Sequence, residues 1–320
     1  MVLKQAALGL LGSRLISDVA VRATRQRLRI IAYHGIPRPD AFERHLIEYA
    51  EGFAPVSGEQ IAAALTRGVR LPDRAVWLTF DDGHPEVETV GRPLLEAYGI
   101  TATMYVCPGV IDTAEPFWWE TVREGERLGL ARGMMEGSQL PLEAKLKTVP
   151  DADRRALVAD LADRIVERLG GPYERVQLST DQLLAWSRGG QEVGNHSWDH
   201  PLLDRCSEED QRRQVSDAHD WLSQVVAPSV WSFAYPNGNW AAPAEHELER
   251  FGYATALGFD HLLARQDRHP LRLSRLRLDT DATTSRLRGV TSGVHPLLLR
   301  GRERFYPGAR SATNPRSLPT

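Results

Sequence analysis

The chain is poor in cysteine and lysine and has no long apolar run. Its two cysteines, Cys107 and Cys206, lie far apart and lack the close spacing of metal-binding pairs, so we expect reduced thiols rather than a disulfide. Lysine occurs only as Lys4, Lys145 and Lys147, so nearly all basic residues are arginine. No run of 18 apolar residues occurs, which predicts that the chain has no membrane span.

The chain also lacks a block of charge of one sign. The net charge of the 320 residues is −3, so the sequence does not indicate a nucleic-acid partner. The composition, 42% hydrophobic and 25% charged, is ordinary for a globular protein and excludes wholesale disorder.

Residues 1–27 are predicted to form an amphipathic N-terminal helix rather than a secretory signal. The apolar stretch 6–11 is interrupted by Ser13 and Arg14, and no small-residue cleavage site follows. Apolar residues instead recur every four positions, at Leu3, Ala7, Leu11, Leu15 and Val19. The helix either packs on the domain or lies on a membrane surface with Lys4, Arg14, Arg22 and Arg25 near acidic headgroups. We expect a cytoplasmic protein, with association at the inner face of the membrane as the alternative.

Short apolar runs alternate with helical patterns along most of the chain. Runs of strand type occupy residues 28–33, 75–80, 101–106, 191–194, 229–234, 253–257 and 271–278. Helical patterns occupy residues 41–51, 58–66, 86–98, 208–226 and 244–251. This alternation implies parallel strand pairing, and the number of strand runs predicts an α/β fold, a distorted (β/α) barrel of about seven parallel strands over residues 28–285.

Two segments interrupt or extend this pattern. Residues 112–184 contain the aromatic cluster Phe117, Trp118 and Trp119 and a charged helical stretch, and we interpret them as a helical insertion near the rim of the site. The aromatic cluster either packs the insertion onto the barrel or stacks against a sugar. Residues 286–320 are predicted to be a partly disordered C-terminal extension.

Polar side chains follow several of the predicted strands. His34, the pair Asp81 and Asp82, His196 and the turn near Asn237 each come directly after a strand run. In barrels of this type the active site lies at the carboxyl ends of the strands. We therefore expect these groups to meet at one mouth of the barrel.

The residue types in these segments suit a hydrolytic metal site. Two histidines, His196 and His200, lie four residues apart, and two carboxylates, Asp81 and Asp82, are adjacent. Two imidazoles and one carboxylate leave a coordination position open for water, and the second carboxylate remains free to act as a base. The alternative is that both aspartates only cap a helix that begins near Pro85.

Three segments resemble the polysaccharide deacetylase family, also described as NodB-homology or carbohydrate esterase 4. They are Thr79-Phe80-Asp81-Asp82-Gly83, residues 192–201 (Glu-Val-Gly-Asn-His-Ser-Trp-Asp-His-Pro) and residues 233–238 (Phe-Ala-Tyr-Pro-Asn-Gly). The resemblance covers residues 28–280 and implies a distorted barrel with about seven strands.

The resemblance also implies a role for each motif residue. Asp81 is the expected catalytic base, and Asp82, His196 and His200 are the expected ligands of a divalent metal. Zinc is the default for this ligand set, although Co²⁺, Ni²⁺ or Fe²⁺ would suit it too. The backbone amide of Asn237 is the expected oxyanion donor.

The chain departs from the common family pattern in two places. The late segment that usually carries an acid histidine contains none, whereas Tyr33-His34 resembles the exopolysaccharide-modifying branch, so His34 is the expected acid. Ala234 replaces the arginine that pairs with the base, and Arg275 is a candidate replacement. The usual tyrosine of the third motif is Asn237 here, and Tyr235 or Trp240 could supply an aromatic wall. His84, which follows the Asp pair, is expected to be solvated, and the alternative is that it lines the cleft.

These residues predict a metal-dependent N-deacetylase that removes acetyl from an N-acetylated amino sugar in a glycan or glycan precursor. One alternative is an amidohydrolase that opens cyclic imides or ureides such as allantoin. The other is a catalytically inactive barrel that binds glycans.

Overall fold

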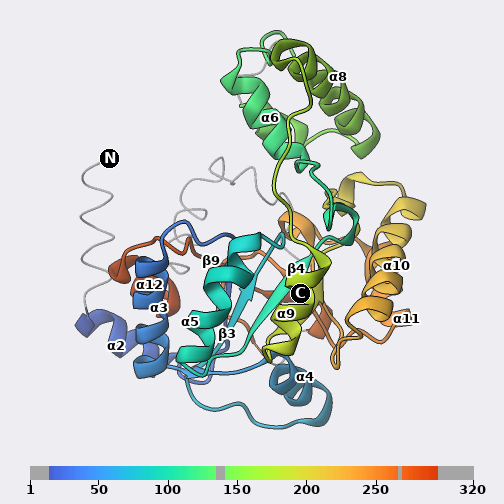
Figure 1. The fold of residues 1–320 in the computed structure, drawn as a ribbon. Helices are drawn as coiled ribbons and strands as arrows, with labels where there is room; N and C mark the ends of the chain where they lie inside the picture. Colours follow the sequence, from blue (N-terminus) through green and yellow to red (C-terminus); the bar gives the residue numbers. More distant parts are fainter. Residues whose placement is uncertain (1–13, 135–140, 266–268, 295–320) are drawn as a thin grey trace, which may run out of the picture.

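The centre of the molecule is a sheet of parallel strands surrounded by helices (Figure 1). The computed structural model describes residues 14–134, 141–265 and 269–294. The strands are β1 (Arg29–Tyr33), β2 (Ala54–Pro55), β3 (Ala75–Phe80), β4 (Ala102–Val106), β5 (Glu192–Asn195), β6 (Ser232–Ala234), β7 (Thr255–Gly258), β8 (Leu273–Ser274) and β9 (Leu276–Arg277).

The sheet curls until its two ends meet in one chain segment. Its order is β8-β7-β6-β5-β4-β3-β1-β9, and the short β2 pairs with the beginning of β3. β8 pairs with β7 and β9 pairs with β1, yet only Arg275 separates β8 from β9 in the chain. The last strand run therefore bridges the first and the penultimate strands, so the barrel is nearly closed, and the prediction of an α/β fold with a distorted barrel of parallel strands is confirmed. When β8 and β9 are counted as one interrupted strand, the strands of the barrel other than the short β2 correspond to the predicted strand runs.

The strands are buried on both faces, which explains their continuous apolar sequences. Ile31, Leu78 and Phe80 pack outward in the main cluster with the surrounding helices. The alternate residues Ile30 and Trp77 belong to a second cluster. This cluster also contains Ile61, from the segment between β2 and β3 that covers the amino ends of the strands. The period of two along each strand thus divides the core into a helix-facing layer and a barrel interior.

Helices connect the strands and cover the barrel. They are α3 (Pro39–Gly52), α4 (Gly58–Arg67), the π-helical turn η1 (Val87–Gly91) with α5 (Arg92–Ala97), α9 (Thr180–Arg188), α10 (Glu208–Val225), α11 (Ala242–Arg250) and α12 (Thr284–Thr291). Short 3₁₀ turns occur at η2 (Pro108–Val110), η3 (Leu203–Arg205), η4 (Pro236–Gly238) and η5 (Pro270–Arg272). The five predicted helical patterns all correspond to helices, with bounds that differ by a few residues.

A helical lobe stands apart from the barrel, on the side opposite α4 (Figure 1). It contains α6 (Trp118–Arg127), α7 (Leu142–Leu146) and α8 (Asp151–Leu169), within the segment interpreted as an insertion. Trp118, Val122, Leu161 and Ile165 form its core, which also includes Leu202 from the segment after β5. The lobe therefore has apolar packing of its own and takes one residue from the barrel's loops.

The N-terminal helix that the structure describes is α2 (Arg14–Ala23), which packs against α12. It buries Ser17 and Val21, whereas Val19, a member of the predicted apolar stripe, is 67% exposed. The side of α2 that packs against α12 is therefore not the side on which Val19 and the predicted apolar stripe lie. Residues 1–13 and 295–320, which hold most of the predicted stripe and C-terminal extension, lie outside the described residues.

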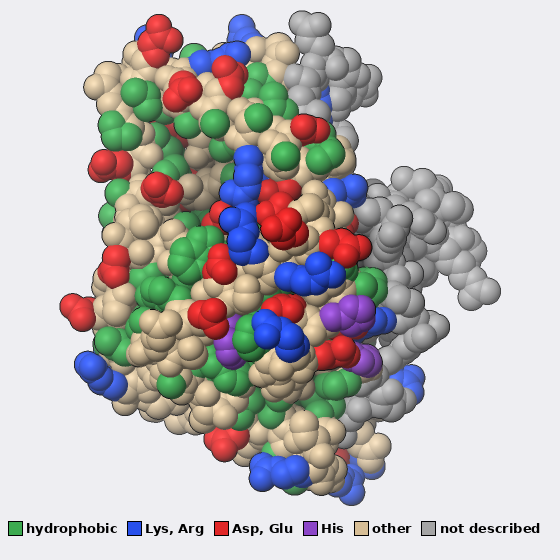
Figure 2. All heavy atoms as spheres, turned by 90° about the vertical axis from the view of Figure 1, so that its right-hand side faces the viewer, with side chains coloured by type: hydrophobic (Ala, Val, Ile, Leu, Met, Phe, Trp, Pro, Cys, Tyr) green, Lys and Arg blue, Asp and Glu red, His purple; other side chains and the backbone are tan. Residues whose placement is uncertain are grey.

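The described surface agrees with the balanced composition. Figure 2 shows basic and acidic side chains interspersed over the lobe and over the face that carries α10 and α11, without a large patch of one sign. Among the described residues, no helix has the length and apolar character needed to cross a membrane. Cys107 and Cys206 are both free thiols, as predicted.

Candidate active site

The polar side chains that follow the strands lie at one mouth of the barrel. The sheet's hydrogen bonding continues one residue beyond the strands: Asp81 donates its amide to the carbonyl of Tyr33 at 2.9 Å, and His196 donates its amide to Val106 at 3.0 Å. The chain direction at these positions is therefore set by the sheet itself. Asp81 and His196 are each 1% exposed.

The backbone turns sharply directly after Asp81. Asp82 has φ 72° and Gly83 has φ 69°, so two consecutive residues occupy the left-handed region. A Cβ on Gly83 would approach Val106 Cγ1 at 3.2 Å, which adds a close contact to the requirement for glycine. A non-glycine residue in this conformation costs about 1–3 kcal/mol and typically marks a functional position. The turn directs the two adjacent carboxylates to different neighbours.

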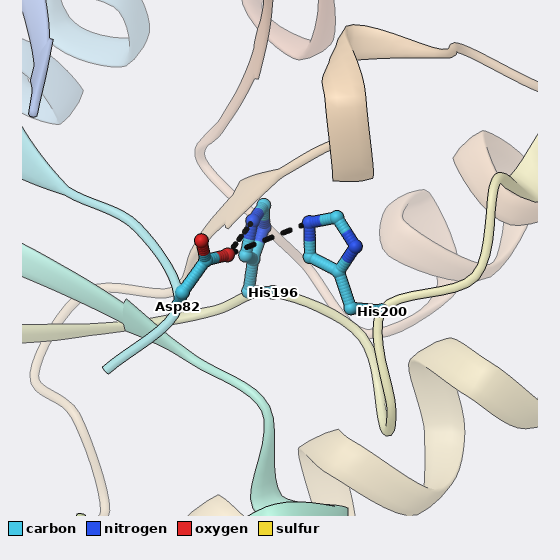
Figure 3. A group of neighbouring side chains, drawn as sticks. All are labelled: Asp82, His196 and His200. Atoms are coloured by element: carbon cyan, nitrogen blue, oxygen red, sulfur yellow. Dashed lines mark ion pairs between the residues drawn. The ribbon is translucent and has the colours of Figure 1, made fainter. Parts of the chain in front are cut away.

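One carboxylate oxygen of Asp82 faces two imidazoles (Figure 3). Asp82 Oδ1 is 3.4 Å from His196 Nε2 and 3.5 Å from His200 Nε2. These three residues form a buried group whose donor atoms all lie within 4.8 Å of one another. Ligands at zinc bond lengths and tetrahedral angles lie about 3.3–3.5 Å apart, so the two separations suit an ion between them.

The protonation and hydrogen bonding of these groups also suit a cation. Asp82 Oδ1 is buried without a hydrogen-bond partner, an orphaned acceptor in a protein interior. His196 Nδ1 lies 2.7 Å from the carbonyl of Ala234, and because a carbonyl only accepts, Nδ1 carries a proton and Nε2 faces the site. The three residues therefore fit a divalent metal.

The second imidazole of this set, that of His200, is held by an aromatic neighbour. Its ring centroid is 4.5 Å from that of Trp119 in an edge-to-face arrangement, and 6.0 Å from that of Phe117. Burial lowers the pKa of His200 to about 3, so the ring is neutral at physiological pH and can act as a ligand.

In a second cluster with metal-ligand chemistry, one carboxylate is already occupied by other partners. It consists of Glu245, Glu249 and His269. The carboxylate of Glu245 accepts hydrogen bonds from Arg272 at 2.7 and 2.8 Å and from Trp240 at 2.7 Å. Because the carboxylate of Glu245 is paired with the guanidinium of Arg272, we interpret this contact as a structural ion pair.

The other carboxylate of the pair, Asp81, has an arginine partner. Arg275 Nη1 is 2.6 Å from Asp81 Oδ1, and the two side chains are 0% and 1% exposed. Arg275 is the residue that interrupts the last strand between β8 and β9. Burial alone would raise the pKa of Asp81, but the charges of Arg275 and His196 outweigh burial and hold this pKa below its ordinary value.

Two histidines approach the second oxygen of Asp82. His34 Nε2 is 3.8 Å and His84 Nε2 is 4.0 Å from Asp82 Oδ2. Their side chains are 29% and 30% exposed, so each has one side toward the site and one toward solvent. Desolvation lowers the pKa of His34, and the carboxylates of Asp82 and Asp81 offset part of this effect. The sequence singled out His34, whereas the structure places His84 at nearly the same distance.

The third motif forms a tight turn after β6. Asn237 has φ 54°, and the amide of Gly238 donates to the carbonyl of Tyr235 at 2.7 Å. The side chain of Tyr235 is buried in the cluster of Phe233 and packs edge-to-face against its ring, while the indole of Trp240 is bonded to Glu245. An aromatic wall formed by either ring stays a prediction.

Three residues near the loop between His196 and His200 carry no signal in the sequence patterns described above. They are Arg155, Gln214 and the ring of Trp119, which was noted only as part of an aromatic cluster. Arg155 and Gln214 lie in helices with many polar residues, and neither has a local signal that marks it out. Trp119 could have been suggested by its place in the segment that follows the carboxyl end of β4.

Comparison with known proteins identifies the barrel. The model of the polysaccharide deacetylase family matches residues 68–256, more than half of the chain. The chain belongs to the polysaccharide deacetylase family. This membership classes it as a hydrolase of the carbohydrate esterase 4 type, which confirms the enzyme class expected from the sequence, and the family motifs Asp81-Asp82 and His196–His200 lie inside the matched region.

Two solved structures share the fold. The Streptococcus pyogenes deacetylase PplD, in complex with acetate, superposes with a TM-score of 0.58 over 82% of this chain and 96% of that chain, at 20% identity. IcaB from Ammonifex degensii gives a TM-score of 0.57 over 83% and 97%, at 15% identity.

A curated relative matches a short stretch of the sequence. It is the peptidoglycan-N-acetylmuramic acid deacetylase PdaC of Bacillus subtilis (strain 168), which is 41% identical over 51 residues. The match spans 16% of this chain and 11% of the length of PdaC.

Proposed function

We propose that this polysaccharide deacetylase is a metal-dependent N-deacetylase that hydrolyses the acetamido group of an amino sugar in a glycan or glycan precursor. The observation that carries the proposal is the arrangement of the two adjacent carboxylates. Asp82 lies within the group suited to a metal, whereas Asp81 is paired with Arg275 and its Oδ2 remains 3.9 Å from His196 Nε2. A ligand set and a separate ionised carboxylate are two of the parts that metal-assisted hydrolysis of an amide uses.

The ligand set would hold a divalent cation, and zinc suits its two imidazoles and one carboxylate. When bound, such a cation lowers the pKa of water and polarises the carbonyl of the acetyl group. Asp82, His196 and His200 supply the donor atoms. The hydrogen bond from His196 Nδ1 to Ala234 keeps that ring oriented with Nε2 toward the site.

Asp81 is placed to act as the general base. Its Oδ1 accepts the hydrogen bond from Arg275, so the ionised form is stabilised and Oδ2 is left to accept a proton from the attacking water. The guanidinium also restricts the rotation of the carboxylate. In this arrangement Arg275 orients the base, and Asp81 transfers the proton.

His34 is our proposed general acid. An amide nitrogen leaves only after it is protonated, so a second residue must deliver a proton to the departing amine. His34 lies on the other side of Asp82 from His196, at the end of β1, and is partly open to solvent. The backbone amide of Asn237, in the turn after β6, is the proposed donor to the oxyanion. The products are acetate and a free amine.

Substitution of each carboxylate separates the two roles. Asp82→Ala should lose both bound zinc and acetate release, whereas Asp81→Asn should keep the ion and lose turnover by about 10²–10⁴-fold. Bound metal is measured by elemental analysis, and acetate release is measured with N-acetylated chitooligosaccharides and with a cyclic imide as the alternative substrate. Retention of full turnover by Asp81→Asn contradicts the assignment of the base. Turnover of the cyclic imide without acetate release contradicts the proposed reaction.

A further inference from the structure

The two histidine ligands are joined by a loop with an unusual backbone. Ser197 has φ 69° and His200 has φ 60°, so two residues of the loop occupy the left-handed region without being glycine. Each such residue costs about 1–3 kcal/mol, and surrounding contacts must maintain the conformation. The position of His200 therefore depends on what holds this loop.

One side of the loop is held by the barrel. Gln214, on α10, accepts hydrogen bonds from the amides of Trp198 at 3.0 Å and Asp199 at 3.2 Å. Its side-chain amide donates to Asp199 Oδ1 at 2.9 Å. The carbonyl of Trp198 accepts a hydrogen bond from Gly109 at 2.8 Å.

The other side is held by the helical lobe. Arg155, on α8, donates from Nη1 to Asp199 Oδ2 at 2.8 Å and from Nη2 to Asp199 Oδ1 at 2.9 Å. This two-bond arrangement is the strongest geometry between a guanidinium and a carboxylate. Arg155 Nε also donates to Asp151 at 2.6 Å, so the arginine is itself fixed at the beginning of α8.

The lobe has two more contacts with the loop region. Trp119, on α6, packs edge-to-face against the imidazole of His200. Leu202, two residues after His200, is buried in the lobe's own core. Charge, aromatic and apolar contacts from the lobe thus converge on the segment that carries the third ligand.

We propose that Arg155 is a positioning residue for His200, and that the lobe controls metal retention through the Arg155–Asp199 pair. The inference rests on the proposed metal site. Arg155 is 47% exposed and Asp199 is 28% exposed, so the pair contributes little to the stability of the whole molecule. The pair instead orients the adjacent loop that carries His200. Substitution of residues that orient metal ligands typically weakens metal affinity by about 10–100-fold.

The test is a measurement of zinc affinity on the metal-free protein, by competition with a chromogenic chelator. Arg155→Gln should weaken zinc binding about tenfold or more. Arg155→Lys keeps the charge but cannot bond both oxygens, so its affinity should be intermediate. Asp199→Asn should weaken binding to a similar extent, and the double variant should be no weaker than the single ones, because either substitution breaks the same contact.

Arg164→Gln is the matched control. Arg164 lies on the same helix, is 44% exposed and pairs with Asp160 at 2.9 Å. This variant should bind zinc like the wild type, and the metal-free forms of Arg155→Gln and Arg164→Gln should have the same unfolding midpoint. Equal zinc affinity of Arg155→Gln, Arg164→Gln and wild type overturns the inference, as do additive losses in the double variant. Failure of the wild type to bind zinc instead contradicts the proposed function.

Discussion

At the scale of single residues, the site depends on adjacent side chains that have different partners. Asp81 and Asp82 are neighbours in sequence, yet one is paired with Arg275 and the other faces the two imidazoles. The left-handed conformation of Asp82 produces this divergence. Two histidines, His34 and His84, approach Oδ2 of Asp82, and an experiment can show which of them is the general acid.

His34 and His84 form a natural matched pair for testing the acid. If His34 protonates the departing amine, His34→Gln should lower N-deacetylation by about 10²–10⁴-fold. It should have a much smaller effect on 4-nitrophenyl acetate, because a nitrophenolate leaves without a proton. His84→Gln, with similar exposure and distance to Asp82, should change both rates little. Equal losses on the amide and the ester by His34→Gln contradict the role of His34, and a selective loss of amide turnover in His84→Gln assigns the acid to His84.

At the scale of elements, a carboxylate at the beginning of a barrel strand binds the N-terminus of helix α4. Glu192, at the beginning of β5, accepts hydrogen bonds from the amides of Gly58 at 2.7 Å and Glu59 at 2.9 Å. It also accepts a hydrogen bond from Thr103 at 2.6 Å. A carboxylate at a helix N-terminus satisfies free amides and interacts favourably with the helix dipole. α4 is thereby fixed over the amino ends of the strands, opposite the site.

Removal of this carboxylate should destabilise the fold without changing the chemistry. Glu192→Ala is expected to lower the free energy of unfolding by roughly 2–4 kcal/mol, since three donors lose a charged acceptor. Glu192→Gln should cost less, because it keeps an acceptor. Urea unfolding measures the change, and Glu59→Gln, exposed on the same turn, is the control. An effect of Glu192→Ala as small as that of the control contradicts this account of α4.

At the scale of the whole molecule, distant parts of the chain close around the barrel. The last strand bridges β7 and β1, and the segment after it returns to the first helices. His45, on α3, lies with Nε2 2.7 Å from the carbonyl of Ala282 and Nδ1 3.0 Å from the hydroxyl of Tyr33. The imidazole is fully buried and joins the beginning and the end of the barrel.

This link should make the stability of the fold depend on pH. Burial lowers the pKa of His45, so below its unfolded value of about 6.5 the unfolded chain binds a proton that the folded protein does not. Stability should therefore fall as pH decreases from 7 toward 5. In His45→Gln this decrease should be shallower, as measured by urea unfolding at each pH. His246→Gln removes an exposed imidazole and should keep the wild-type slope. Identical slopes for His45→Gln and the wild type contradict the prediction.

Much of the fold could be predicted because its signals are local. The strand runs are apolar over a few residues, and the helices between them have their own periodicity and caps, such as the capping box at Ser57. The motif residues could be placed together because the carboxyl ends of parallel strands lie on the same side of a barrel. The interruption of the last strand at Arg275 could not be predicted, because it depends on how the barrel closes.

The sequence by itself determined the fold class, the family motifs and the residue types at the mouth of the barrel, since each depends on residues close together in the chain. The family resemblance also made Arg275 a candidate partner of Asp81, but only the tertiary structure decided that these two residues pair and that Arg155 pairs with Asp199. Arg275 and Asp81 are 194 positions apart, and Arg155 and Asp199 are 44 apart. Such contacts depend on the curvature of the closed sheet and the placement of the lobe, and no local pattern of side chains encodes either.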